Sequence, residues 1–126
     1  MDVAQRNVVR TDVITGFVQG VAVSPDGQEV WVARQDSSVV VLSASTGAII
    51  GTVETVPGGF GVTMADGGDV VLVTRIFIGD VVAIRRATRA VIGSLQLGGS
   101  AVRIATHPSS GTVLVANQGG SVAVIR

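Results

Sequence analysis

The feature that most constrains the fold is an internal repeat, which recurs about every 40 residues along the chain. In the first repeat, four short apolar segments fall at residues 21–23, 29–34, 38–42 and 48–53. They are separated by residues that favour turns, mainly Gly, Asp, Ser and Pro. Short apolar segments between such residues predict β-strands joined by tight turns.

The same order of segments returns twice. The second repeat has its segments at residues 62–65, 69–75, 80–84 and 90–95, and the third at 102–105, 113–117 and 121–125. The third segment of each repeat is a nearly continuous apolar run, which predicts a strand buried on both faces. Four strands at this period match one blade of a β-propeller. We therefore predict an all-β chain, a β-propeller of four-stranded antiparallel blades with three blades per chain.

The third repeat lacks a fourth segment, and the N-terminus supplies a candidate for it. Residues 8–11 align with residues 91–94, the fourth segment of the second repeat. We expect residues 1–14 to form an outer strand that completes a neighbouring blade. The three blades would then occupy residues 16–56, 57–98 and 99–126, the last with three strands only. The 126 residues equal three repeats of about 42, which favours a self-sufficient unit over a fragment of a longer propeller.

Three blades are too few to close a ring without strain, because propellers usually have about 4–8 blades. An open arc would expose two apolar blade faces and unpaired strand edges, and both invite association. We predict that two chains form a homodimer, a ring of six blades in which each N-terminal strand completes the partner's last blade. A homotrimer with nine blades is the alternative.

The charge and the cysteine count limit the partners and cofactors of the chain. All 9 basic residues are Arg, and 9 acidic residues balance them to a formal net charge of zero. A neutral chain argues against a nucleic-acid partner and against docking to an anionic membrane. The absence of Cys excludes disulfides and thiolate metal sites. Neither a signal peptide nor a membrane span is indicated, so a soluble chain of open localisation is expected.

The repeats resemble those of the YVTN family of β-propellers. The resemblance rests on the Ser-Pro-Asp-Gly turn at residues 24–27 and on the tetrapeptides at residues 31–34, 72–75 and 114–117. Only the third tetrapeptide keeps the terminal Asn, as Asn117, while Arg34 and Arg75 stand in the other two. The resemblance implies a propeller fold. The family includes surface-layer modules, binding scaffolds and enzyme domains, so it does not define a function.

Four polar residues are candidates for a ligand site around the mouth of the central channel. Arg34, Arg75 and Asn117 end the second segments of the three repeats, and Arg103 aligns with Ala22 and Thr63 in the first segments. Arginine suits bidentate recognition of carboxylate or phosphate. The alternative interpretation is a set of solvated arginines, paired with acids such as Asp36, Asp80 or Glu54.

Aromatic residues offer a second kind of candidate. Phe60 and Phe77 fall in predicted loops of the second repeat, where they would form either a recognition patch or local loop packing. Trp31 begins a strand pattern and is expected in the core. His107 has no nearby His or Cys and is expected to be a turn residue rather than a metal ligand.

No combination of residues indicates catalysis, because nothing in the sequence joins a nucleophile to a base and an orienting acid. We therefore predict a self-assembling scaffold or binding module that is not an enzyme and needs no cofactor. The alternative is a small-ligand propeller that binds an anion or a glycan. An enzyme of the lactonase or dehydrogenase type is less favoured, because the first segments offer few metal-binding side chains.

Overall fold

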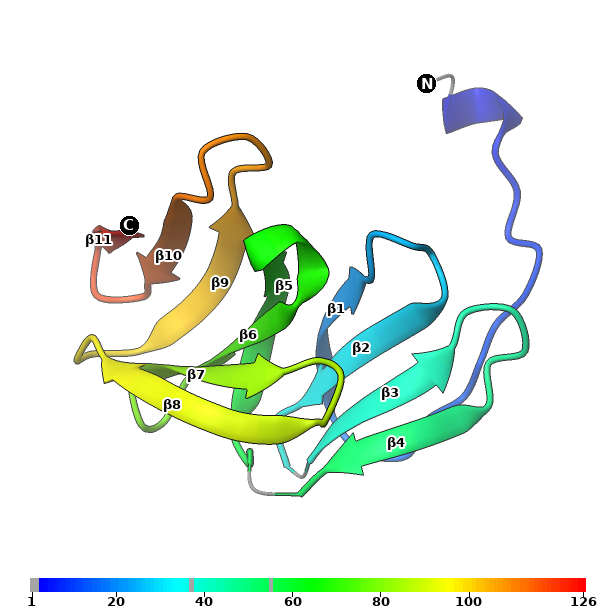
Figure 1. Cartoon of the computed structure of the whole chain (residues 1–126), viewed down its shortest axis with the longest axis horizontal. Helices are drawn as coiled ribbons and strands as arrows, with labels where there is room; N and C mark the ends of the chain where they lie inside the picture. The colour runs from blue at the N-terminus through cyan, green and yellow to red at the C-terminus, as the bar shows by residue number, and fades with distance from the viewer. Residues whose placement is uncertain (1–2, 37, 55) are drawn as a thin grey trace.

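Three antiparallel sheets follow one another along the chain in the computed structural model, which describes residues 3–36, 38–54 and 56–126 (Figure 1). The first sheet contains β1 (Val18–Val23), β2 (Glu29–Arg34), β3 (Val39–Ser43) and β4 (Ile49–Val53). The second contains β5 (Gly59–Ala65), β6 (Val70–Arg75), β7 (Asp80–Arg85) and β8 (Ala90–Gln96). The third contains β9 (Ala101–Thr106), β10 (Val113–Asn117) and β11 (Ser121–Ile125). Two 3-10 turns, η1 (Val3–Gln5) and η2 (Asp66–Gly68), complete the described elements.

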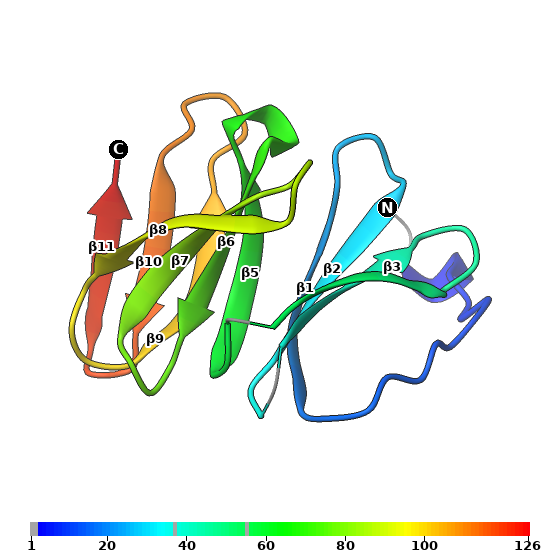
Figure 2. The same cartoon turned by 60° about the horizontal axis from the view of Figure 1, so that its bottom comes forward.

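Each sheet is a meander in which neighbouring strands along the chain are hydrogen-bonded neighbours in the sheet. The first strands of the three sheets lie side by side, β1 against β5 and β5 against β9. They form the inner edge of an arc, and β4 and β8 lie at its outer edge (Figures 1 and 2). This arrangement confirms the predicted all-β propeller fold, with four strands in each of the first two blades and three in the last.

The turns that separate the strands follow the sequence signals. At the predicted turn after β1, the N–H of Gly27 donates to the carbonyl of Ser24 at 2.8 Å, and Gly27 has a φ of 72°. The corresponding Gly67 in the second blade has a φ of 65°. A positive φ of this size favours glycine, which explains why both turns carry it.

The hydrophobic core lies between the blades rather than within them. One cluster joins the first blade to the second and is built from Trp31, Ala33, Val39, Val41, Val53, Val56, Val62, Val71, Val73, Val82 and Ile84. Trp31 is fully buried in this cluster, as predicted. A second cluster joins the second blade to the third and is built around Val81, Ala101, Val113 and Val115. Each blade therefore depends on its neighbour to cover one apolar face.

The third strand of the last blade differs from those of the other two blades. β3 and β7 are buried on both faces as predicted, whereas β11 is largely exposed, so the prediction for the third run is wrong. In the described structure no further sheet packs on the outer face of this blade. Val122 and Val124 of β11 are therefore 64% and 56% exposed.

The N-terminal segment runs along the outer side of the first blade (Figure 2). Residues 6–17 form no strand in the single chain. The Arg10 guanidinium donates to the carbonyl oxygens of Ala44 and Ser45, and Ile14 packs on a third apolar cluster around Val40. The predicted pairing of this segment with the last blade of a second chain stays a prediction, and Met1 and Asp2 lie outside the described residues.

Candidate functional site

The inner strands β1, β5 and β9 carry the part of the predicted site that the fold brings together. Equivalent residues of these three strands can be identified because each pairs with the second strand of its own blade, β2, β6 or β10. In those second strands, Trp31, Leu72 and Leu114 are equivalent, since each begins the tetrapeptide of its repeat. The inner-strand residues opposite these three are Ala22, Thr63 and Ala105. Ala105 therefore holds the place that the sequence alignment assigned to Arg103.

The predicted alignment of Arg103 was wrong by two residues. Counting back from Ala105 places Arg103 at the position of Gly20 in β1 and Gly61 in β5. The error arose because an apolar run does not fix its own register. Pro25 and Pro108 carried the correct signal, since each follows its inner-strand alanine, Ala22 or Ala105, at the same spacing.

Glycine at positions 20 and 61 lets adjacent inner strands approach closely. A Cβ atom at Gly61 would lie 2.5 Å from the carbonyl oxygen of Val102 in β9. A Cβ atom at Gly20 would come closer still to the carbonyl oxygen of Phe60 in β5. Both contacts are too short for real side chains, so the two internal junctions require glycine at this position.

Arg103 and Phe60 form a pair on the inner strands that the sequence did not predict. The Arg103 guanidinium carbon lies 4.8 Å from the centroid of the Phe60 ring, within the range of a cation–π interaction. Its Nη1 also donates to the carbonyl oxygen of Gln19 at 3.2 Å. Phe60 lies within β5 rather than in the predicted loop, because β5 begins at Gly59.

A shallow hollow of about 270 Å³ lies beside Arg103. Its lining residues come from all three inner strands and are Gln19, Gly20, Val21, Gly61, Val62, Arg103 and Ile104. None of these residues is acidic, so the positive charge of Arg103 is not neutralised by the wall of the hollow. An uncompensated guanidinium held in place by two contacts suits binding of a small anion.

Arg34 and Arg75 do not project freely around a channel mouth. Arg34 donates to the carbonyl oxygens of Ser38 and Thr15 at 3.1 and 2.9 Å, and so ties the loop after β2 to the N-terminal segment. Arg75 forms a two-point ion pair with Asp80, whose side chain is 4% exposed. Hydrogen bonding to Asp80 raises the pKa of Arg75 further. Both arginines therefore stabilise their own loops.

Asn117 and Phe77 also lie apart from the Arg103 pair. The Asn117 side chain donates to the carbonyl of Gly98 at 2.8 Å and accepts from the N–H of Gly119 at 3.0 Å, which fixes two turns of the third blade. Phe77 lies in the loop after β6 and is 76% exposed. Of the six candidate residues, the fold joins only Arg103 and Phe60.

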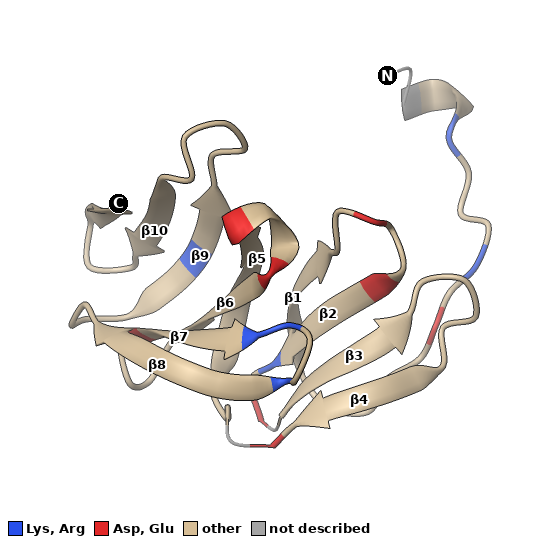
Figure 3. Cartoon of the chain, viewed as in Figure 1, with Lys and Arg blue, Asp and Glu red and all other residues tan. Residues whose placement is uncertain are grey.

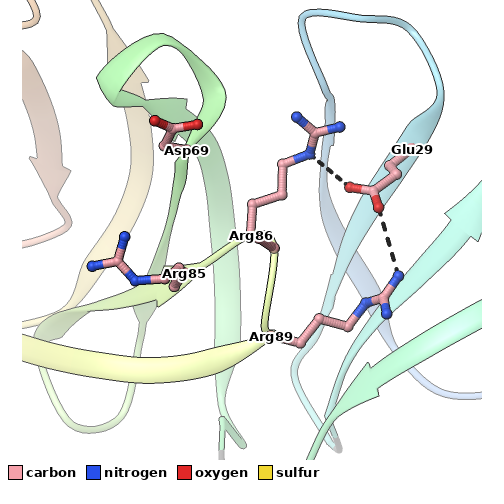
Figure 4. A pocket seen from close by; sticks show the side chains of 6 residues that line it. Glu29, Asp69, Arg85, Arg86 and Arg89 are labelled. Atoms are coloured by element: carbon pink, nitrogen blue, oxygen red, sulfur yellow. Dashed lines mark hydrogen bonds and ion pairs between the residues drawn. The ribbon is translucent and has the colours of Figure 1, made fainter.

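An ion-pair cluster between the first two blades was missed by the sequence analysis. The Arg86 guanidinium binds the Glu29 carboxylate at 2.7 Å, and Arg89 lies 3.6 Å from the same carboxylate (Figure 4). Arg86 also binds the carboxylate of Asp26. Figure 3 shows these basic residues at the turn between β7 and β8, near the acidic start of β2. Glu29 and Arg86 are 57 residues apart, so no local pattern could reveal the pair.

The cluster lowers the pKa of both carboxylates. Hydrogen bonds from the Ser24 hydroxyl, the Gln28 N–H and Arg86 hold the pKa of Asp26 well below its ordinary value. Burial on its own raises the pKa of Glu29, but hydrogen bonds from Arg86 and Trp31 outweigh it, so that pKa is lowered as well. The surrounding hollow of about 470 Å³ also contains Asp69 and Arg85, and its charges are mostly paired.

The described residues offer little for a metal ion. Within residues 3–36, 38–54 and 56–126, no group of three or more His, Asp or Glu side chains converges. His107 lies at the predicted turn, where its Nδ1 accepts from the N–H groups of Ser109 and Ser110 at 3.3 and 3.2 Å. No helix among the described elements has the length and hydropathy needed to cross a membrane.

Comparison with known proteins identifies the architecture but not a family. No protein-family model matches the sequence, and neither does any curated protein. Among solved structures, the chain is similar to hydrazine synthase of Kuenenia stuttgartiensis, with a TM-score of 0.80 and 21% identity over 95% of this chain. It is also similar to the β-propeller domain of Cps50 (Swd1) of Myceliophteria thermophila, with a TM-score of 0.77 and 13% identity over 94% of this chain.

The matches cover only 36% and 38% of those two solved chains, so this chain spans little more than a third of each. At such low identity the similarity shows the fold alone. The chain therefore has the fold of a three-blade arc of a β-propeller.

Proposed function

We propose that this chain is a β-propeller scaffold or binding module, without catalytic activity, that assembles with a second copy of itself. The observation that supports the assembly is the outer face of the third blade. Leu114, Val122 and Val124 are 42%, 64% and 56% exposed on this face. Apolar side chains grouped in this way mark interaction surfaces more often than free surface.

The same chain carries the complementary face. In the second blade, Val62 points toward the first blade and is 8% exposed. Val21 holds the same position in β1 and is 62% exposed in the described structure. Val21 thus offers to the third blade of another copy the kind of contact that Val62 makes with the first blade. Val32, Val40 and Leu42 on the same face are already buried, with Ile14 of the N-terminal segment packed on them. Two copies joined in this way give six blades, within the usual range.

The N-terminal segment supports strand exchange in this assembly. Ile14, Val56 and Leu97 each precede an inner strand by a few residues, and each packs on the cluster of the blade that follows. Residues just before Val56 and Leu97 form the fourth strands β4 and β8. By the same spacing, residues around Val8 and Val9 would form a fourth strand, and these side chains are 85% and 95% exposed in the single chain. They would complete the partner's third blade.

A pair of matched substitutions tests the assembly. Val122→Asp places a charge on the outer face of the third blade, and Val91→Asp places one on β8, where the side chain is 42% exposed and would stay exposed in a ring. Sedimentation velocity should find the Val122→Asp variant as a monomer and the Val91→Asp variant as a dimer. Equal masses for the two variants would contradict the proposed interface. Deletion of residues 1–14 should release the ring into monomeric or aggregating arcs.

A second candidate function is binding of a small anion in the channel, and the uncompensated charge of Arg103 favours it. NMR titration with inorganic phosphate or citrate should shift the backbone amide signals of residues that line the hollow, such as Gly20 and Gly61. Arg103→Gln should abolish the response, whereas Arg85→Gln should preserve it, because Arg85 is exposed on another face and no hydrogen bond or ion pair involves its side chain in the described structure. Equal responses from the two variants would mean that the anion binds elsewhere.

The resemblance to the YVTN family is retained as part of the proposal. It is supported by the equivalent places of Trp31, Leu72 and Leu114 at the starts of the three tetrapeptides, each opposite the same inner-strand position. Neither nucleic acid nor membrane is proposed as a partner, since the chain is neutral.

A further inference from the structure

We infer that Arg103 prevents the third blade from making the close inner-strand contact that joins the other blades, so that the junction between two copies stays open beside the channel. The inference rests on the proposed assembly and concerns the geometry of its interface. It makes Arg103 a residue that determines how the interface packs, in addition to any role in binding an anion.

The internal junctions define what a close contact requires. In both of them, a glycine of one inner strand faces a carbonyl oxygen of the next: Gly20 faces Phe60, and Gly61 faces Val102. A Cβ atom at Gly61 would lie only 2.5 Å from the Val102 carbonyl oxygen, whereas an ordinary van der Waals contact is 3.4 Å or more. Even alanine would therefore force the strands apart.

The third junction lacks this glycine. Arg103 holds the position of Gly20 and Gly61, and Gln19 holds the position of Phe60 and Val102. In a ring that repeated the internal geometry, the Cβ of Arg103 would meet the Gln19 carbonyl of the second copy. Restoring an ordinary contact would need a separation of about 1 Å more than at the Gly61 junction.

The rest of the Arg103 side chain strengthens the obstruction. It folds back toward its own chain, over the Phe60 ring, and donates to the Gln19 carbonyl of the same chain. It would therefore not extend across the interface to form a new bond with the second copy. We expect the outer strands to carry the interface between copies, and the inner strands to leave a gap at Arg103.

Three variants separate the Cβ obstruction from the charge and from the flexibility of glycine. Arg103→Gly removes the Cβ atom, Arg103→Ala removes the charge but keeps the Cβ atom, and Ala105→Gly adds a glycine to the same strand without removing the obstruction. The dimer dissociation constant of each should be measured by sedimentation velocity, with circular dichroism as a check of the fold.

Arg103→Gly should tighten the dimer by roughly tenfold or more, because without the Cβ atom the inner strands of the two copies can make the close contact that the internal junctions make. Arg103→Ala and Ala105→Gly should change the dissociation constant by less than about threefold. If Arg103→Gly and Arg103→Ala tighten the dimer equally, or if neither does, the inference is wrong. A dimer that withstands Val122→Asp would instead contradict the proposed assembly, which keeps the two failures distinct.

Discussion

The first and third blades carry apolar residues at equivalent positions of one face, the face by which the first blade packs on the second. These residues differ sharply in exposure between the two blades. Trp31, Val39 and Val41 of the first blade are fully buried against the second blade. The equivalent Leu114, Val122 and Val124 of the third blade are 42%, 64% and 56% exposed. Residues of the same apolar character thus form a core in one place and a surface in the other. The difference supports the proposal that a second copy covers this face of the third blade.

The inner strands show where this equivalence ends. The first and second blades have glycine where the third has Arg103. The outer parts of the blade faces therefore repeat, while the inner edge of the last blade does not. Arg103 therefore belongs both to the hollow on the inner strands and to the proposed interface, whereas Val122 and Val124 belong to the proposed interface alone.

The largest expected effect is at Trp31. Trp31→Ala should lower the free energy of unfolding by about 3–5 kcal/mol, because it leaves a large cavity between the first two blades. Leu114→Ala, at the equivalent position, should cost less than about 1 kcal/mol in the monomer. Urea unfolding at two protein concentrations checks both values. The loss of unfolding free energy caused by Leu114→Ala should grow with protein concentration, because this substitution weakens only the association of two copies. Equal losses of unfolding free energy for the two variants at low protein concentration would contradict the difference in burial between the first and third blades.

A smaller effect is expected at the inner-strand glycines. Gly61→Ala should destabilise the chain by about 1–3 kcal/mol, because the added Cβ atom meets the backbone of β9. Gly93→Ala in β8 is the matched control, since nothing lies within 4 Å of a Cβ atom there. That control should be neutral or slightly stabilising in thermal unfolding. A tolerated Gly61→Ala would show that the inner strands separate easily, which would weaken the argument about Arg103.

The smallest effect is expected in the dependence of stability on pH. The pKa values of Asp26 and Glu29 are lowered in the folded chain from ordinary values of 3.8 and 4.5. Their contribution is therefore present above those ordinary values and is lost as the pH falls through the lowered ones. Arg86→Gln removes the shared partner, so the variant should lose less stability than the native chain between about pH 5 and pH 2. Parallel pH profiles of unfolding would show that the cluster contributes nothing.

The strands and turns could be predicted from the sequence because their signals are local. Each turn carries its own Gly, Asp or Pro, and each strand its own run of Val and Ile. The burial of Trp31 followed from the same pattern. The order of the blades then followed from the repeat, since successive meanders can only stack face to face once their apolar faces are formed.

The site could be predicted only in part, because its contacts join distant residues. The register that gives Arg103 the position held by Gly20 and Gly61 in the other blades depends on strand pairing, which a run of apolar residues leaves open. Glu29 and Arg86 meet only after two blades have packed together. Arg34, Arg75 and Asn117 were predicted to end the second strands, and Asp80, the partner of Arg75, was among the acids of the alternative interpretation. The backbone partners of Arg34 and Asn117 could not be told from the residue types alone.

The mass of the chain in solution tests the central claim most directly. Sedimentation velocity over a range of concentrations should find a species of about twice the chain mass of 12.7 kDa, which dissociates on dilution. A species that stays at 12.7 kDa at every concentration, and remains folded and free of aggregates, would contradict the account. The exposed face of the third blade would then not be a surface for a second copy.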